Sequence, residues 1–111
     1  MPEKLILFQK FYDFTVGFYP VINRLPKSHR ITTGKLLEEK CISTLLNISL
    51  ANKSTGDARK LLQKSISKDL DSLQILVRLC KDLRFVSVKQ YVYQITKLNE
   101  TAKILQGWIR A

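Results

Sequence analysis

Turn-forming residues are scarce in this 111-residue sequence, which has only 4 glycines and 3 prolines. Their scarcity argues against an all-β fold with many tight turns and against a disordered linker. No apolar run approaches the ~18–20 residues needed to cross a membrane. The N-terminus also lacks the charged, apolar and small-residue order of a secretion signal. We therefore expect a single domain, without a membrane span, in the cytoplasm.

Groups that carry catalysis or bind metals are equally scarce. The two cysteines, Cys41 and Cys80, lie in apolar stretches without a C-x-x-C motif, so a buried, reduced pair is expected, with a disulfide as the alternative. Neither has a neighbouring zinc ligand. The sequence has a single histidine, His29, and no glycine-rich phosphate-binding loop. It therefore gives no support for nucleophilic catalysis or for nucleoside triphosphate chemistry. The expectation is a protein that is not an enzyme and has no cofactor and no metal.

Acidic residues are also few, with 9 Asp and Glu against 19 Lys and Arg, for a net charge of +10. A small domain with this imbalance usually has a polyanionic partner, most often nucleic acid. The alternative is a solvated, lysine-rich surface without such a partner.

Helical spacing of apolar residues extends over most of the chain and predicts an all-α fold. Pro26 is a helix stop, whereas Pro20 lies inside a pattern that continues beyond it and predicts a kink. Pro2 and Glu3 suit a helix start. Two capping motifs precede the later helices, with Ser54 and Asp57 in one and Ser87 and Gln90 in the other. We expect an antiparallel, up-down-up-down four-helix bundle with helices at about 2–25, 30–52, 55–83 and 88–110.

Each predicted helix has an apolar stripe, and the second helix has two, so it is either central in the bundle or buries a face in an oligomer. The stripe of the first helix is Leu5, Phe8, Tyr12, Val16, Tyr19 and Ile22. The second helix carries Leu37, Cys41, Leu45 and Ile48, and also Leu36, Ile42, Leu46 and Leu50. The third carries Leu62, Ile66, Leu70, Leu73, Val77 and Cys80, and the fourth Val88, Tyr91, Ile95, Leu98, Ala102, Leu105 and Ile109.

Basic residues gather around the first and third predicted loops, which lie at the same end of an up-down-up-down bundle. The first group is Arg24, Lys27, His29, Arg30 and Lys35, and the second is Lys81, Arg84 and Lys89. The two groups predict one patch that binds nucleic acid through phosphates, without base readout. His29 has two possible interpretations: it contacts a phosphate, or it is a loop residue with no functional role. A further basic stripe, usable by RNA or simply solvated, consists of Arg59, Lys60, Lys64 and Lys68.

Three other residues are candidates for structural or interface roles. Arg78 lies among apolar neighbours and is expected to be a paired, partly buried arginine at an interface. Gly107 lies inside the last helix, where it costs ~1 kcal/mol relative to Ala unless it permits a close backbone approach. Trp108 is expected either to fill the end of its own bundle or to touch a neighbouring subunit.

Several segments give the chain a likeness to a known family. "LVRLCKDL" (76–83), "SVKQY" (87–91) and "LQGWI" (105–109), with the looser Tyr19–Pro20 and "LPKSH" (25–29), resemble the accessory variability determinant (Avd) proteins of diversity-generating retroelements. These belong to a wider group of four-helix bundles that includes the proteins encoded in 23S rRNA intervening sequences. Gln106 departs from the small residue expected before Gly107.

The resemblance implies a homopentamer of bundles arranged as a basic, barrel-shaped ring without enzymatic activity. It also implies binding to the retroelement's reverse transcriptase and to its template RNA, with the cDNA as a further ligand, in support of mutagenic retrohoming. Two alternatives stay open. One is an intervening-sequence-type protein that acts without a polymerase, and the other is an interaction oligomer whose charge only confers solubility.

Overall fold

The computed structural model describes residues 3–111, with side chains from Leu5 onward. It confirms the all-α prediction, since no strand occurs in this range. The elements are α1 (Glu3–Asn23), α2 (Lys27–His29), a π-helical turn η1 (Arg30–Gly34), α3 (Lys35–Asn52), α4 (Gly56–Asp82) and α5 (Val88–Arg110). Within this range, no helix is long and apolar enough to span a bilayer.

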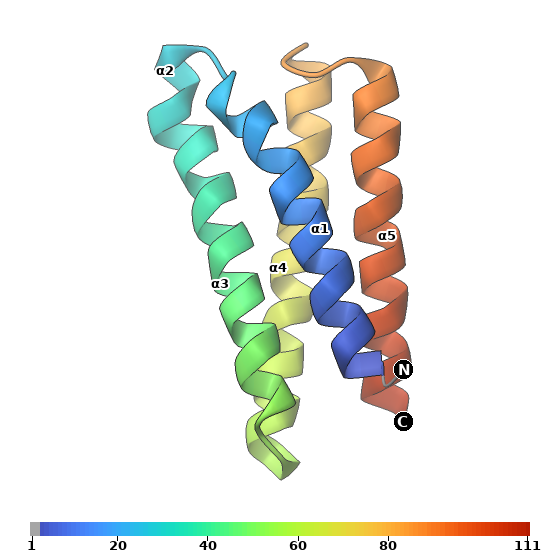
Figure 1. Ribbon diagram of the computed structural model, residues 1–111. Helices are drawn as coiled ribbons and strands as arrows, with labels where there is room; N and C mark the ends of the chain where they lie inside the picture. Colours follow the sequence, from blue (N-terminus) through green and yellow to red (C-terminus); the bar gives the residue numbers. More distant parts are fainter. Residues whose placement is uncertain (1–2) are drawn as a thin grey trace.

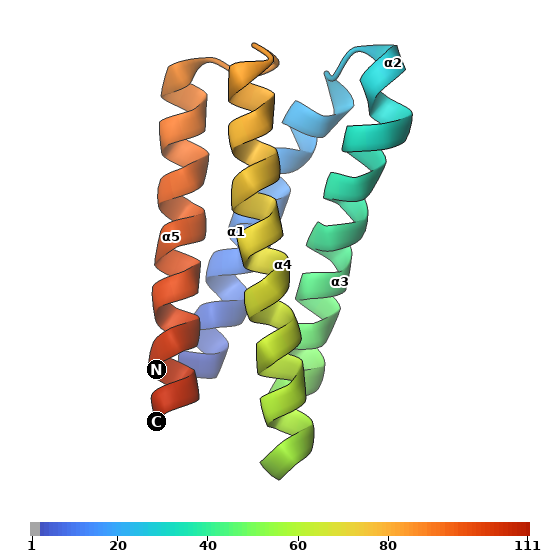
Figure 2. The ribbon, with the colours of Figure 1, turned by 180° about the vertical axis from the view of Figure 1, so that it is seen from behind.

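The long helices form an antiparallel bundle 42 Å long, with cross-sectional dimensions of 25 and 18 Å. α1 and α4 each pack against both α3 and α5, and each helix runs opposite to its neighbours (Figures 1 and 2). The connections that follow α1 and α4 lie together at one end, which we call the loop end. The C-terminus and the α3–α4 connection lie toward the other end, which we call the terminal end.

Helix boundaries differ from the sequence prediction mainly around the first connection. α1 runs through Pro20 but ends at Asn23, two residues before the predicted limit. The predicted helix start at Pro2 lies outside the described residues. The second predicted helix starts earlier, at Lys27, because Pro26 is followed by one α-helical turn and the π-helical turn η1. Helical geometry therefore extends into the first predicted loop.

The predicted apolar stripe of α1 is wrong for most of its length. Leu5, Tyr12 and Val16 are exposed and Phe8 and Tyr19 are half-buried, so only Ile22 of that set is buried. The buried face carries Leu7, Phe11, Phe14, Phe18 and Val21. Both stripes have helical spacing, and packing favours the one richer in phenylalanine, whose ring has no hydroxyl to desolvate.

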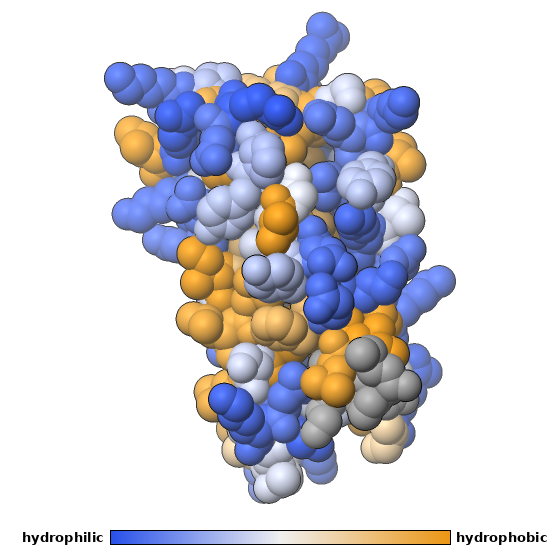
Figure 3. Space-filling model, in the orientation of Figure 1, coloured by the Kyte–Doolittle hydropathy of each residue, from blue (hydrophilic) through white to orange (hydrophobic). Residues whose placement is uncertain are grey.

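α3 and α4 bury the stripes that the sequence predicts. On α3 the first stripe is buried, apart from the half-buried Leu45, and the second is exposed. Leu46, at 64 % exposure, is the most exposed residue of that second stripe. Apolar surface is visible across the face formed by α1 and α3 in Figure 3. α4 buries its stripe except for the half-buried Leu62.

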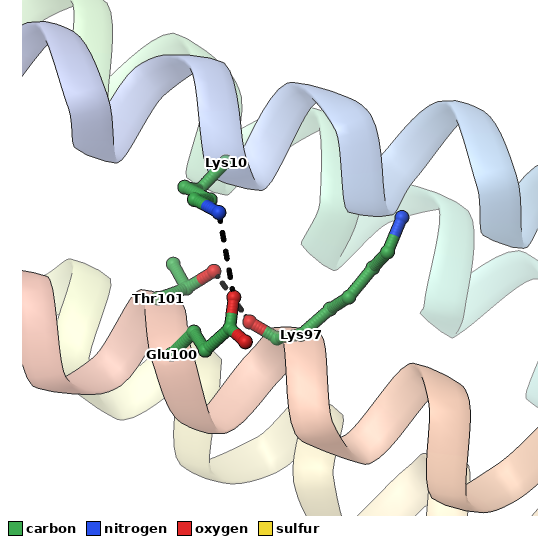
Figure 4. A network of polar contacts seen from close by, with 4 residues as sticks. All are labelled: Lys10, Lys97, Glu100 and Thr101. Atoms are coloured by element: carbon green, nitrogen blue, oxygen red, sulfur yellow. Dashed lines mark hydrogen bonds and ion pairs between the residues drawn. The ribbon is translucent and has the colours of Figure 1, made fainter.

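The predicted stripe of α5 is only partly correct. Leu98 and Leu105 are buried, but Val88 and Ile109 are exposed. The helix is rotated so that two polar residues enter the core, and its buried positions are Gln94, Leu98, Thr101, Leu105 and Trp108. Thr101 satisfies its hydroxyl within the helix by donating to the carbonyl of Lys97 at 2.8 Å (Figure 4).

One of the two predicted capping motifs is confirmed. The Ser87 side chain accepts a bond of 3.0 Å from the amide of Gln90 at the start of α5. The Ser54–Asp57 box is wrong, because Thr55 is the N-cap of α4 and makes no side-chain cap bond. Ser54 instead donates to the carbonyl of Leu50 at 2.8 Å and closes the end of α3. A cap one residue later places Ala58, not Asp57, at the third helical position.

Polar contacts join neighbouring helices along three seams. Lys10 of α1 pairs with Glu100 of α5 at 3.5 Å (Figure 4), and Lys40 of α3 pairs with Asp69 of α4 at 3.3 Å. The amides of Gln74 and Asn99 bond at 2.8 Å between α4 and α5. An exposed pair such as Lys10–Glu100 contributes roughly 0–1 kcal/mol, so the buried apolar cluster supplies most of the stability.

Candidate nucleic-acid interface

The first and third connections touch at the loop end. The imidazole ring of His29 lies against the ring of Phe85, with centroids 4.8 Å apart. Because these residues belong to the two connections, their contact brings together the two basic groups that the sequence separates by some fifty residues. The expectation that both groups lie at one end of the bundle is therefore met.

Arg30 is tied to the protein backbone. Its Nη2 atom donates to the carbonyls of Asn23 at 2.8 Å and Leu25 at 3.3 Å. Carbonyls at a helix C-terminus lack partners within the helix, and a nearby cation satisfies them. Arg30 thus caps the end of α1, which leaves fewer of its donors for a ligand.

The third connection has an unusual backbone at Arg84. The amide of Arg84 donates to the carbonyl of Lys81 at 2.9 Å, and that of Phe85 donates to Cys80 at 2.8 Å. This bond pair is a Schellman motif, in which the residue after the helix takes a left-handed conformation and is usually glycine. Here that residue is Arg84, with φ of 64°, and its exposed side chain stands at the turn.

Charges at this end are poorly compensated. Asp82 accepts contacts from Lys81 at 3.3 Å and from Arg78 at 3.8 Å. Among the described residues, no ion pair involves the other predicted cations, and all of them are exposed: Arg24, Lys27, Lys35, Arg84 and Lys89. Unpaired, solvated cations of this kind are available to phosphate groups.

A depression of about 780 Å³ opens beside these cations. Its lining includes Lys81, Arg84, Phe85 and Tyr91. The ammonium of Lys81 lies 4.7 Å from the centre of the Tyr91 ring. Surfaces that bind single-stranded nucleic acid combine cations with aromatic rings, because the cations contact phosphates and the bases stack on the rings. The two aromatic residues were not predicted as site residues, although the alternation in "RFVSVKQY" (84–91) indicates them.

The three candidate structural residues are all on α4 and α5. Arg78 is paired with Asp82, but its side chain is 71 % exposed, so the expected partial burial is wrong for the single chain. The helix runs through Gly107, and no atom lies within 4 Å of a Cβ built there, so no close approach occurs within this chain. Trp108 is 8 % exposed and belongs to the core cluster, which confirms that it fills the end of its own bundle.

Both cysteines are buried and unpaired. Burial raises the pKa of the Cys41 thiol to about 12; a hydrogen bond with Thr15 opposes the increase, and the Glu38 carboxylate adds to it. Burial also raises the pKa of Cys80. In the described residues, no three His, Cys, Asp or Glu side chains gather as metal ligands would.

Comparisons with known proteins identify a family from the sequence and a similar fold among solved structures. A family model described as bAvd-like matches residues 5–111. The chain is also similar to a crystal structure from Bacteroides thetaiotaomicron VPI-5482, described as a protein with unknown function from the S23 ribosomal protein family. The TM-score is 0.88 at 15% sequence identity, and the likeness covers 98% of this chain and 99% of that one. No curated protein matches significantly.

Proposed function

The chain belongs to the bAvd-like family, and from this premise we propose that it is a non-catalytic, basic accessory subunit of a diversity-generating retroelement. It binds the reverse transcriptase together with template RNA or cDNA and so supports mutagenic retrohoming. The observation that carries this proposal is the loop end, where Lys81 and Arg84 line a depression together with Phe85 and Tyr91, and further exposed cations lie in the same two connections.

Binding at this end would be electrostatic and largely independent of sequence. Exposed cations such as Lys27 and Lys89 are positioned to neutralise phosphates, and each neutralised phosphate releases counterions. The aromatic rings add stacking, which every base provides. Selectivity for one RNA would then come from the complex with the polymerase.

The same proposal includes assembly into a homo-oligomer, a pentameric ring as the family resemblance implies. The exposed second stripe of α3, together with Tyr12 and Val16 of α1, supports it. Contiguous exposed apolar surface marks an interaction site more often than a solvated one. From Cys41 to Asn52, moreover, α3 contains no charged residue.

A second candidate is an intervening-sequence-type protein that acts without a polymerase. The structural likeness to the S23-family protein favours it, although at 15% identity that likeness concerns the fold. Purification from a host that expresses the tagged chain distinguishes the two, because only the retroelement subunit retains a reverse transcriptase.

A salt titration tests nucleic-acid binding directly. Affinity for single-stranded RNA should fall steeply between ~50 and ~200 mM salt. The loop-end variant, Lys27→Glu with Lys89→Glu, should bind more weakly and reduce the salt slope by about 1.4, at ~0.7 per phosphate contact. A mid-bundle variant, Lys10→Glu with Lys97→Glu, changes the net charge equally and serves as the matched control. Affinity that ignores salt, or that falls equally in both variants, would overturn the proposed interface.

A further inference from the structure

A second basic groove lies at the terminal end, far from the loop end. It has a volume of about 770 Å³ and lies between the first turns of α4 and the last residues of α5. α4 contributes Arg59, Lys60, Gln63 and Lys64, and α5 contributes Trp108 and Ile109. This groove therefore combines three cations with an aromatic ring and an apolar wall.

Arg59 is positioned in this groove by two contacts. Its Nε atom donates to the carbonyl of Ala51 at 3.1 Å, and its guanidinium lies 5.4 Å from the centre of the Trp108 ring. The remaining guanidinium nitrogens have no acceptor among the described residues. A guanidinium fixed in this way presents its free donors to a phosphate with little further loss of conformational entropy.

The cations of the groove lack acidic partners. Among the described residues, no ion pair involves Arg59, Lys60 or Lys64, nor Lys103 and Arg110 farther along α5. Asp57, in the first turn of α4, is the acidic residue nearest in the sequence to Arg59 and Lys60. The groove thus repeats the features of the loop end, which are unpaired cations beside an exposed depression with an aromatic component.

Acidic residues separate the two basic regions. Four of the nine lie near the middle of their helices, and two more, Glu38 and Glu39, lie near the start of α3. Lysines such as Lys10 and Lys40 offset part of this charge. The six are Asp13, Glu38, Glu39, Asp69, Asp71 and Glu100. A nucleic-acid strand that ran along the bundle from one end to the other would pass these carboxylates, which repel phosphates.

We propose that the terminal groove is a second phosphate-binding surface, so that one chain holds two nucleic-acid segments, one at each end. This inference rests on the proposed function, since it assigns a second place to the same class of ligand. The ends belong to a bundle 42 Å long. A six-nucleotide strand spans about 20 Å when its bases are stacked at the ~3.4 Å spacing of a duplex strand. Two such strands therefore fit separately on one chain.

The number of strands bound per chain tests the proposal. Titration calorimetry with a six-nucleotide uridine strand at low salt should give two strands per chain. The terminal-groove variant, Lys60→Glu with Lys64→Glu, should halve this number, as should the loop-end variant. The mid-bundle variant should still bind two. One strand per chain, with the terminal-groove variant unchanged, would overturn the inference and leave the proposed function standing.

Energy transfer between two strands gives a second readout. An equal mixture of donor- and acceptor-labelled strands should show transfer with the natural chain, and either end variant should abolish it while one strand still binds. In an oligomer, strands at the loop ends of different subunits would also give transfer, so the measurement is made with the Leu46→Glu chain, in which the exposed face of α3 carries a charge that should keep the chain monomeric. In that chain, transfer that survives in the terminal-groove variant contradicts the proposal. If no strand binds the natural chain at all, both the inference and the proposed function fail.

Discussion

The amide of Arg84 bonds to the carbonyl of Lys81, and this bond fixes an arginine in a backbone conformation that favours glycine. A non-glycine residue in this region costs roughly 1 kcal/mol. Such strain persists where the side chain serves a purpose, and the Arg84 side chain is an exposed cation beside the depression at the loop end. The proposed interface therefore predicts that stability and ligand binding oppose each other at this position.

Replacing Arg84 by glycine separates these two effects. Arg84→Gly should raise the free energy of unfolding by about 1 kcal/mol, because glycine adopts positive φ without strain. The same variant should bind RNA more weakly, through loss of one phosphate contact. Urea unfolding and a salt titration measure the two quantities. Arg84→Lys is the control and should keep the binding without the gain in stability; equal RNA affinity in all three proteins would remove Arg84 from the interface.

The N-cap residues of α5 and α4 predict unequal losses of stability when each is replaced by alanine. Ser87→Ala removes the side-chain bond to the amide of Gln90 and should lower the free energy of unfolding by about 1 kcal/mol. Thr55→Ala should lower it by only a few tenths, because Thr55 makes no cap bond. Denaturant midpoints of the two variants decide the matter, and equal losses would contradict the assigned bonding.

Two glycines should respond to alanine in opposite directions. Gly107→Ala should stabilise α5 by about 0.5–1 kcal/mol, because the position is helical and a Cβ meets no atom. Gly56→Ala should destabilise by about 1 kcal/mol, since φ there is +60°. Thermal unfolding measures both. A Gly107→Ala chain that loses its assembly would place a neighbouring subunit against this residue.

The buried thiol of Cys41 predicts a pH dependence of stability. Its pKa of about 12 lies above the value of 9.0 that applies to an unperturbed thiol. Between those values the unfolded chain loses the proton and the folded chain keeps it, so stability is complete below pH 9 and falls as the pH rises toward 12. The loss amounts to about 4 kcal/mol at most, at ~1.4 kcal/mol per pH unit.

Comparison with Cys41→Ala isolates this contribution from the lysines and tyrosines that titrate in the same range. The variant should be less stable at pH 7, because it loses buried volume. Its unfolding free energy should decline less steeply than that of the natural chain above pH 9. Parallel declines in urea unfolding would mean that the thiol ionises equally in both states.

The outer face of α3 predicts an assembly that one charge disrupts. Leu46→Glu should dissociate the oligomer and leave the helices intact, because Leu46 is 64 % exposed and contributes little to its own core. Leu61→Glu on α4, at 70 % exposure, is the matched control and should leave the assembly unchanged. Light scattering gives the mass and circular dichroism the helicity. A natural chain that is monomeric at micromolar concentration would exclude the proposed ring.

Periodicity in the sequence predicts where helices lie better than it predicts which face they bury. On α3 the sequence identified both stripes and left open whether the bundle buries both, and the structure exposes the second one. On α1 the spacing of Phe8, Tyr12 and Tyr19 competes with that of Phe11, Phe14 and Phe18, and only packing chooses between them. The hydroxyls of the tyrosines were the available signal.

The candidate site was predictable to the extent that topology determines it. Alternating helix directions bring the first and third connections together, so the basic groups could be placed at one end from the sequence. Local geometry could not be anticipated in the same way. The cap formed by Arg30, the left-handed Arg84 and the packing of Arg59 on Trp108 depend on tertiary contacts that no short motif encodes.

The two unpaired cysteines also make the molecule's dynamics accessible without added probes. Cys80 lies two residues before the end of α4 at the loop end, whereas Cys41 lies in the interior of α3. A buried thiol reacts with an alkylating reagent only when the structure around it opens. Pulse labelling followed by mass spectrometry would therefore time the opening of the loop end and of the bundle interior separately. Ligand that slows labelling of Cys80 but not of Cys41 would show that binding rigidifies the loop end alone.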